Sequence, residues 1–178
     1  MRWKYLVNHL SPYLSDVNNV LDLGASCGRL AYKLSERLPQ INFVGIDTYV
    51  QPKIYIPIKE YNGTNIPYPD NYFDCVMMVD VIHHVEHPEI VLNEAKRVSK
   101  KYILIKDHYW NNKFDLVMLK LADYNGNKLY GVNLPYNFLK VAEWNSLFKD
   151  HNLRTINIEK FRCNVVDPCR HIIFKLEK

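Results

Sequence analysis

The sequence predicts one α/β domain: a doubly wound, seven-stranded sheet, mostly parallel, with an antiparallel C-terminal hairpin and helices on both faces. Residues 20–47 read as strand, small-residue turn, helix and strand, which is a βαβ unit. Residues 73–81 form a near-continuous apolar run, the pattern of a parallel strand buried on both faces. Residues 154–161 and 171–176 alternate apolar and polar side chains, as the two strands of a closing hairpin would.

The remaining elements follow from the same patterns. An amphipathic helix over residues 1–15 is expected to pack on the edge of the sheet. Helical spacing of apolar residues predicts further helices, over residues 30–38, 88–99, 114–124 and 143–152. The expected parallel strands are residues 20–23, 43–47, 54–58, 73–81 and 101–106.

Length and composition restrict the class of protein. The 178 residues fit one domain, and 48% hydrophobic with 24% charged residues is ordinary for a soluble globular chain. The net charge of +4 permits a nucleic-acid partner without indicating one. Four cysteines form no CxxC pair and no signal peptide is recognised, so a cytoplasmic protein with reduced thiols is expected. The longest apolar run is too short to cross a bilayer, so no membrane partner is expected.

The turn after the first strand carries the clearest motif, formed by Gly24, Ala25, Ser26, Cys27 and Gly28. Small residues let a ligand approach the backbone, and the following helix offers free N–H groups at its N-terminus. A dinucleotide site needs G-x-G-x-x-G, and two of its three glycines are missing. No Walker G-K-[ST] follows either. The pattern is instead D-x-G-x-x-x-G, with an acidic residue at the end of the second strand.

This pattern, Asp22, Gly24 and Gly28 followed by Asp47, resembles the first motif of class I S-adenosylmethionine-dependent methyltransferases. The resemblance implies S-adenosylmethionine as cofactor, with Asp22 facing its amino end and Asp47 binding the ribose hydroxyls. Ser26 stands where the family commonly has a third glycine. Asn62 takes the place of the acid that binds the adenine amine; an ordinary Asn-Gly turn is the alternative. The expected cofactor-binding residues are Asp22, Gly24, Ala25, Ser26, Gly28, Asp47, Thr48, Asn62 and Asp80.

Residues 82–88, Ile-His-His-Val-Glu-His-Pro, resemble the Leu-His-His-Val-x-x-Pro turn of small-molecule-type class I methyltransferases. Ligands of open α/β sheets bind at the carboxyl ends of the strands, so this turn should lie near the transferred methyl group. Histidine can act as a general base near pH 7. The expected catalytic residues are Asp80, His84 and His108. Histidines that only stabilise the loop are the alternative. A metal cluster of His83, His84 and His87 lacks a companion ligand, so no metal is expected.

The same family often places acceptor-recognition insertions between the fifth and sixth strands, which here points to residues 107–142. Residues 123–127 and 131–137 are expected to be loops that contact the acceptor, although a purely structural crossover is the alternative. Residues 1–18 would form an N-terminal helix and a small lid, all within a single domain over residues 1–178. The expected acceptor-side residues are His83, Asp107, Asp123, Asn127, Tyr136 and Asn137.

Three functions remain open. The leading hypothesis is methyl transfer to an oxygen or nitrogen of a small molecule or side chain. A nucleic-acid, especially RNA, methyltransferase is the second; the Asp/Asn-Pro-Pro-aromatic turn of amino-group enzymes is absent, and a ribose-methylating set could only be assembled from Lys4, Asp80, Lys106 and Glu159. The third is a non-catalytic partner subunit with the same fold.

Overall fold

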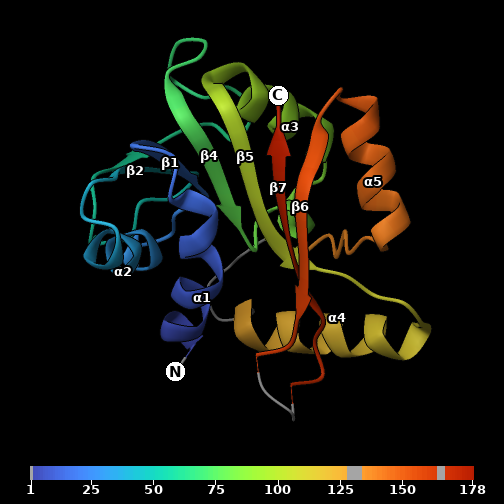
Figure 1. Cartoon of the computed structure of the whole chain (residues 1–178). Coiled ribbons are helices and arrows are strands. Elements are labelled where there is room, and N and C mark those ends of the chain that lie inside the picture. The colour runs from blue at the N-terminus through green and yellow to red at the C-terminus, as the bar shows by residue number, and fades with distance from the viewer. Residues whose placement is uncertain (1, 128–133, 164–166) are drawn as a thin grey trace.

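The computed structural model describes residues 2–127, 134–163 and 167–178. Among these residues, seven strands form one sheet in the order β3-β2-β1-β4-β5-β7-β6 (Figure 1). The strands are β1 (Asn19–Leu23), β2 (Asn42–Asp47), β3 (Ile58–Glu60), β4 (Phe73–Val79), β5 (Ser99–His108), β6 (Arg154–Phe161) and β7 (His171–Glu177). Strands β1 to β5 pair in parallel, and β7 pairs antiparallel with both β5 and β6. The predicted fold class is therefore confirmed.

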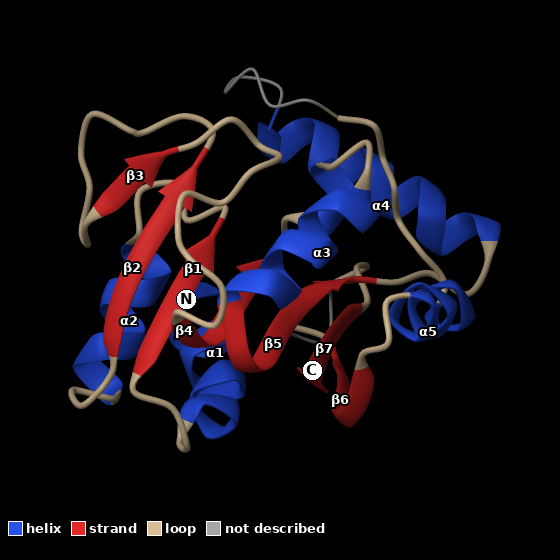
Figure 2. Cartoon of the chain, turned by 90° about the horizontal axis from the view of Figure 1, so that it is seen from above, coloured by secondary structure: helices blue, strands red, loops and turns tan. Residues whose placement is uncertain are grey.

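Helices cover both faces of the sheet (Figure 2). The described helices are α1 (Arg2–Leu10), η1 (Ser11–Leu14), α2 (Arg29–Arg37), η2 (Ile82–His84), α3 (Pro88–Val98), α4 (Lys113–Asn127) and α5 (Val141–Asp150). Helices α1 and α2 pack on one face, and α3 and α5 pack on the other. Within the described residues, none of the helices combines the length and the apolar character that a bilayer span requires.

Alternating side chains on the central strands fill the two cores. On β1, Val20 packs with the α1 and α2 layer, whereas Leu21 and Leu23 pack with the α3 and α5 layer. The second core is rich in aromatic rings: Trp144 and Phe148 of α5 lie 5.7 and 4.8 Å, centroid to centroid, from Phe174 of β7. Parallel strands buried on both faces read as continuous apolar runs, which is why β4 could be predicted.

Helix α1 lies on a face of the sheet, and the expectation that it packs on the edge is wrong. Leu6 and Leu10 are buried in the same cluster as Met77 of β4 and Leu104 of β5. Helix α2 covers β1 and β2, so without α1 these apolar side chains of the central strands would face water. The edge strands of the sheet are β3 and β6, and β6 belongs to the C-terminal hairpin.

The third strand is shorter than expected and begins only at Ile58. Pro57 has no N–H to donate to a ladder, although its carbonyl accepts a bond from the Gly45 N–H at 2.8 Å. The Ile56 side chain is buried instead and packs against Gly28, the last residue of the glycine turn between β1 and α2. Of the isoleucines whose alternation predicted a strand over residues 54–58, Ile56 is buried but Ile54 is 44% exposed, so the alternation does not mark a strand here.

Residues 123–127 extend α4, and the expectation of a loop there is wrong. The helix begins at a well-formed cap: the Asp115 N–H donates to the Asn112 side chain at 2.9 Å. The Asp115 carboxylate in turn accepts from the Asn111 N–H. Helix α4 lies across the carboxyl ends of β4 and β5 (Figure 1). The part of residues 131–137 that is described, residues 134–137, has no helix or strand, as predicted.

Candidate functional site

The glycine turn between β1 and α2 has the backbone that its sequence requires. Gly24 and Gly28 have φ angles of +76° and +73°, a left-handed region that side chains disfavour. A Cβ atom on Gly24 would lie 2.5 Å from the Val81 Cγ2 atom, so the turn also packs tightly against the end of β4. Ser26, at the third glycine position of the family pattern, is left-handed too, with φ of +53°.

Asp47 connects the turn to the end of β2. Its Oδ2 atom accepts from the Ser26 N–H at 2.7 Å, and its Oδ1 atom accepts from the Tyr49 N–H at 3.3 Å. Thr48, which follows it on the surface, lies with its hydroxyl 3.5 Å from the same carboxylate. The carboxylate therefore stands at the rim of the turn, where the predicted ribose contact requires it.

Asp22 is buried on β1 next to this turn. Burial first, and then the charge of the nearby Asp47, raise the pKa of its carboxyl to about 7. Two carboxyl groups so close together favour a cationic ligand group, such as the ammonium of an amino acid. The predicted set Asp22, Gly24, Ser26 and Asp47 is therefore gathered in one place and fits S-adenosylmethionine, whose amino end and ribose these groups would hold.

Asn62 is used differently. Its side-chain oxygen accepts from the Thr64 and Asn65 N–H groups at 3.0 and 2.8 Å, so in this conformation it closes a turn. The Asn-Gly turn explains the residue, and the adenine contact stays a prediction. Tyr61, which the sequence did not single out, is half-buried beside Asp47, and burial together with that charge raises its pKa to about 12.

A buried ion pair marks the end of β4. Asp80 is left-handed, with φ of +57°, and its carboxylate lies 2.5 Å from the Lys106 Nζ atom. Lys106 is almost completely buried on β5. A lysine inside the apolar run of β5 is the sequence signal for this residue, which was considered only within the set for ribose methylation. Asp80 thus neutralises a buried cation at the predicted methyl-transfer position.

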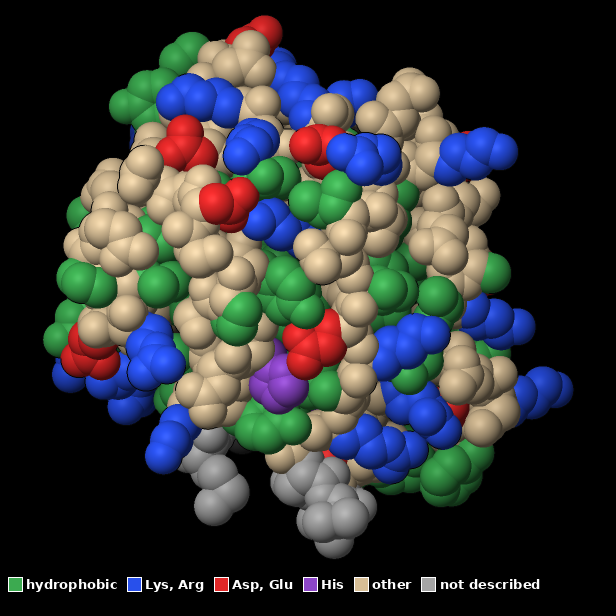
Figure 3. Space-filling model, viewed as in Figure 1, with side chains coloured by type: hydrophobic (Ala, Val, Ile, Leu, Met, Phe, Trp, Pro, Cys, Tyr) green, Lys and Arg blue, Asp and Glu red, His purple; other side chains and the backbone are tan. Residues whose placement is uncertain are grey.

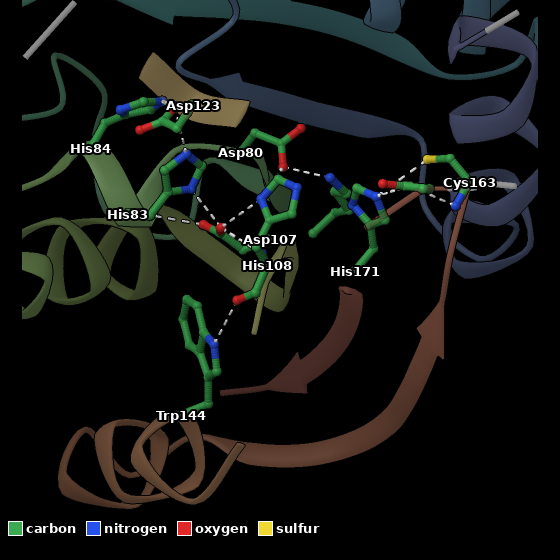
Figure 4. A network of polar contacts seen from close by, with 11 residues as sticks. Asp80, His83, His84, Asp107, His108, Asp123, Trp144, Cys163 and His171 are labelled. Atoms are coloured by element: carbon green, nitrogen blue, oxygen red, sulfur yellow. Dashed lines mark hydrogen bonds and ion pairs between the residues drawn. The ribbon is translucent and has the colours of Figure 1, made fainter. Parts of the chain in front are cut away.

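His83 is clamped between two carboxylates (Figure 4). Its Nδ1 atom lies 2.6 Å from the Asp107 Oδ1 atom, and its Nε2 atom lies 3.7 Å from the Asp123 Oδ1 atom. Burial lowers the pKa of His83, but these acids outweigh that effect and raise it to about 10. The side chain is therefore an imidazolium that ties η2 to β5 and α4. It cannot act as a base near pH 7.

His84 occupies the outer side of the same cluster. Its Nε2 atom lies 3.6 Å from the Asp123 Oδ1 atom, and its ring is 4.0 Å from the His83 ring, centroid to centroid. The side chain is only partly buried, so an acceptor can reach it. Asp123, predicted to lie on the acceptor side, is indeed brought to the two histidines, although from a helix rather than a loop.

His108 ends β5 with its Nδ1 atom 3.4 Å from the Asp80 Oδ1 atom, without hydrogen-bond geometry. Burial lowers its pKa, and the Lys106 charge lowers it further, so the imidazole is neutral. Its ring lies 4.5 Å, centroid to centroid, from that of His171, which the sequence did not single out. Burial, Lys106 and His108 lower the pKa of His171 to about 3.

The other predicted acceptor residues have structural partners. Asp107 is fully buried and accepts from the His108 N–H at 2.7 Å as well as from His83. Asn137 donates from its N–H to the His83 carbonyl and from its side chain to the Val85 carbonyl, at 3.1 and 2.6 Å. Tyr136 is left-handed and half-buried. The side chain of Asn127 lies outside the described residues.

Three groups of side chains carry donor atoms that could hold a metal ion. Among the described residues they are His83, Asp107 and His108; His83, His84 and Asp123; and Cys163, Asp167 and His171. In the third group Asp167 already accepts hydrogen bonds from the Cys163 and Cys169 N–H groups and contacts the His171 Nε2 atom at 2.9 Å. His87 is exposed and pairs with Glu89. The absence of a metal stays a prediction.

The set proposed for ribose methylation is only half assembled. Asp80 and Lys106 are paired, as described above. Glu159 lies on β6 and accepts from the Tyr13 hydroxyl at 2.8 Å and contacts the His9 Nδ1 atom at 2.6 Å. This acid therefore serves the contact between the hairpin and the N-terminal helical segment.

Comparison with known proteins identifies a family for the chain. The profile of the family described as methyltransferase domain matches residues 2–160. The ubiquinone/menaquinone biosynthesis C-methyltransferase UbiE of Cupriavidus taiwanensis is 27% identical over 141 residues, which cover 68% of this chain and 58% of that protein. The chain thus aligns with little more than half the length of this curated relative.

Solved structures share the fold. A SAM-dependent methyltransferase of Methanosarcina mazei superposes with a TM-score of 0.71 at 16% identity, covering 96% of both chains. Geranyl diphosphate methyltransferase, solved with GPP and sinefungin, gives 0.74 at 10% identity, covering 98% of this chain and 77% of that one. With the profile match over most of its length, the chain belongs to the methyltransferase-domain family.

Proposed function

We propose that the protein transfers a methyl group from S-adenosylmethionine to an oxygen or nitrogen of a small molecule bound between η2, the end of β5 and α4. The observation that carries this proposal is the position of Asp123: α4 brings its carboxylate onto His83 and His84 beside Asp80. These residues occupy the carboxyl ends of the central strands, where open α/β sheets bind their ligands. We also assign the turn at residues 82–88 to the small-molecule-type HHVxxP subgroup, because its sequence resembles that pattern and it lies at the carboxyl ends of the central strands.

Each residue has a separable task. The cofactor supplies a methyl group that is already activated on a sulfonium, so the protein chiefly aligns donor and acceptor. His84 takes the acceptor's proton, and the Asp123 carboxylate, 3.6 Å from the Nε2 atom, stabilises the imidazolium that results. His83 keeps its proton and positions Asp123. The buried pair of Asp80 and Lys106 fixes the end of β4 beneath the reacting groups. His108 is a neutral second base.

The relatives suggest which acceptors to try first. The UbiE proteins are named as C-methyltransferases of ubiquinone and menaquinone biosynthesis, and one structural neighbour methylates geranyl diphosphate. An activated carbon is therefore the second candidate for the methylated atom, and the same base would serve it. One neighbour was solved in complex with the Trm112 methyltransferase activator, so a partner subunit is a further arrangement to examine.

The test is formation of S-adenosylhomocysteine with a panel of small phenols, hydroxyquinones and amines, and with RNA as a separate arm. We expect turnover with one small-molecule class, and we expect His84→Ala to lower kcat at least tenfold with little change in cofactor affinity. His87→Ala is the matched control, because this exposed histidine lies outside the cluster and should leave kcat unchanged. Turnover only with RNA, or equal activity of His84→Ala and wild type, would contradict the proposal.

A further inference from the structure

Helix α4 exposes its apolar side. Phe114, Val117, Leu121 and Tyr124 are 70, 53, 51 and 41% exposed, respectively. Their spacing of three, four and three residues places them along one stripe of the helix. Large apolar side chains gathered in this way on a surface mark an interaction site, whereas isolated ones do not. We call these four residues the α4 stripe.

The inward side of α4 is, by contrast, partly acidic. Among the side chains of this helix that the structure describes, the buried ones are Asp115, Leu119 and Asp123, which recur at intervals of four. Asp115 bonds Arg170 at 2.9 Å, and Asp123 contacts the two histidines of the site. Leu119 joins a small cluster with Phe138 and Cys169, separate from the two main cores. The apolar stripe is therefore not needed to hold the helix on the protein.

Positive charges border the stripe. Lys113 and Lys120 lie on the exposed surface of α4, and Lys140 lies 4.4 Å above the Trp110 ring, near the start of the helix. Both acids of α4 point inward, so the described outer surface of the helix carries cations and no anion. Figure 3 shows Lys and Arg side chains collected at the lower right, beside hydrophobic side chains at the end of α4 where it leaves β5.

From this combination we infer that α4 docks the enzyme on a membrane surface that contains anionic lipids. A helix lying in the interface buries an apolar stripe among the acyl chains while flanking lysines contact the headgroups. A second copy of the chain is a poorer partner, since it would bring the same lysines together in a protein with a net charge of +4.

This contact differs from a membrane span, for which no helix among the described residues is long and apolar enough. It also reaches beyond the proposed function, because it does not depend on which acceptor is methylated. Asp123 lies on the side of α4 opposite the stripe, so docking would hold the acceptor side of the enzyme next to the bilayer. An acceptor dissolved in the membrane would then have a short path to the site.

The experiment is co-sedimentation of the full chain with vesicles of phosphatidylcholine alone and of phosphatidylcholine mixed with phosphatidylglycerol. We expect binding to the anionic vesicles that weakens as salt increases. Leu121→Glu and, separately, Val117→Glu should each lower this binding by about tenfold or more, because each places a charge in the apolar layer. Ile158→Glu is the matched control: Ile158 is 48% exposed on β6, away from α4, and its variant should bind like wild type.

Circular dichroism and thermal melting verify that each variant is folded. The inference is overturned if the folded wild-type chain binds neither kind of vesicle, if it binds both equally, or if the two α4 variants bind as well as Ile158→Glu. Should the wild-type chain ignore vesicles but form a dimer that Leu121→Glu dissociates, the stripe is an interface between copies and the lipid contact is wrong.

Discussion

The two ends of the site are built in opposite ways. The cofactor end comes from one continuous stretch, residues 20–47, in which a left-handed glycine turn and two acidic side chains form the site. The acceptor end is assembled from η2, the last residues of β5 and one turn of α4, held together by buried charges. Short-range structure specifies the first, whereas long-range ionic contacts specify the second. The two ends should therefore respond differently to substitution, in kind and in magnitude.

The largest effect is expected at the acceptor end, for Asp107→Asn. Removing this carboxylate leaves the buried His83 imidazolium without its closest partner, which costs about 3–5 kcal/mol of unfolding free energy. Urea unfolding measures it. Asp70→Asn is the control, since it removes the exposed partner of Arg97 and should cost less than about 1 kcal/mol. Equal losses of unfolding free energy in the two variants would show that the contact of His83 with Asp107 does not stabilise the protein as a buried charge pair.

Asp22→Asn comes next, and its effect depends on pH. The pKa of Asp22 in the folded protein is raised to about 7, so its ionisation opposes folding above that pH. Wild-type stability should rise as pH falls from 8 toward 5, and the variant should lack this slope and be more stable at pH 8 by up to about 4 kcal/mol. Its affinity for S-adenosylmethionine should nevertheless be lower. Thermal melting across this pH range would contradict the account if the two slopes were parallel.

At the glycine turn a smaller loss is expected for Gly24→Ala. The left-handed backbone and the Val81 side chain oppose the new methyl group, and the two together cost about 1–2 kcal/mol. Gly126→Ala is the control, because a Cβ there meets no atom within 4 Å and favours the α4 helix. The free energies of unfolding of the two variants should change in opposite directions; a loss of similar size in both would remove the argument from strain.

The smallest effect should be a gain. Ser26→Gly relieves a left-handed non-glycine residue and keeps the N–H that donates to Asp47. Because glycine also gives the unfolded chain more freedom, we expect a net stabilisation of only about 0.5 kcal/mol. Chemical denaturation with several replicates can resolve it. A clear destabilisation would mean that the Ser26 side chain makes a contribution in the folded state that the strain argument leaves out.

The cofactor end could be predicted from the sequence, whereas the contacts of the acceptor end could not. Asp22, Gly24 and Asp47 lie within one βαβ unit, so spacing alone brought them together. The ion pair of Lys106 with Asp80 and the place of His171 depend on strand pairing, which no local pattern shows. The sequence predicts Asp123 as an acceptor-side residue but in a loop, because its contact with His83 and His84 depends on residues distant along the chain. The irregular segment before β3 was mistaken for a strand because Ile54 and Ile56 recur at alternate positions, although neither belongs to a strand.

The central claim is that cofactor binding belongs to the β1–β2 end and proton transfer to the α4 end. Calorimetric titration with S-adenosylhomocysteine tests it most directly, using wild type, Asp47→Ala and His84→Ala. We predict micromolar binding by wild type, about −8 kcal/mol, no measurable binding by Asp47→Ala, and wild-type affinity for His84→Ala. Unchanged affinity in Asp47→Ala, or loss of binding in a folded His84→Ala, would contradict the division of the site.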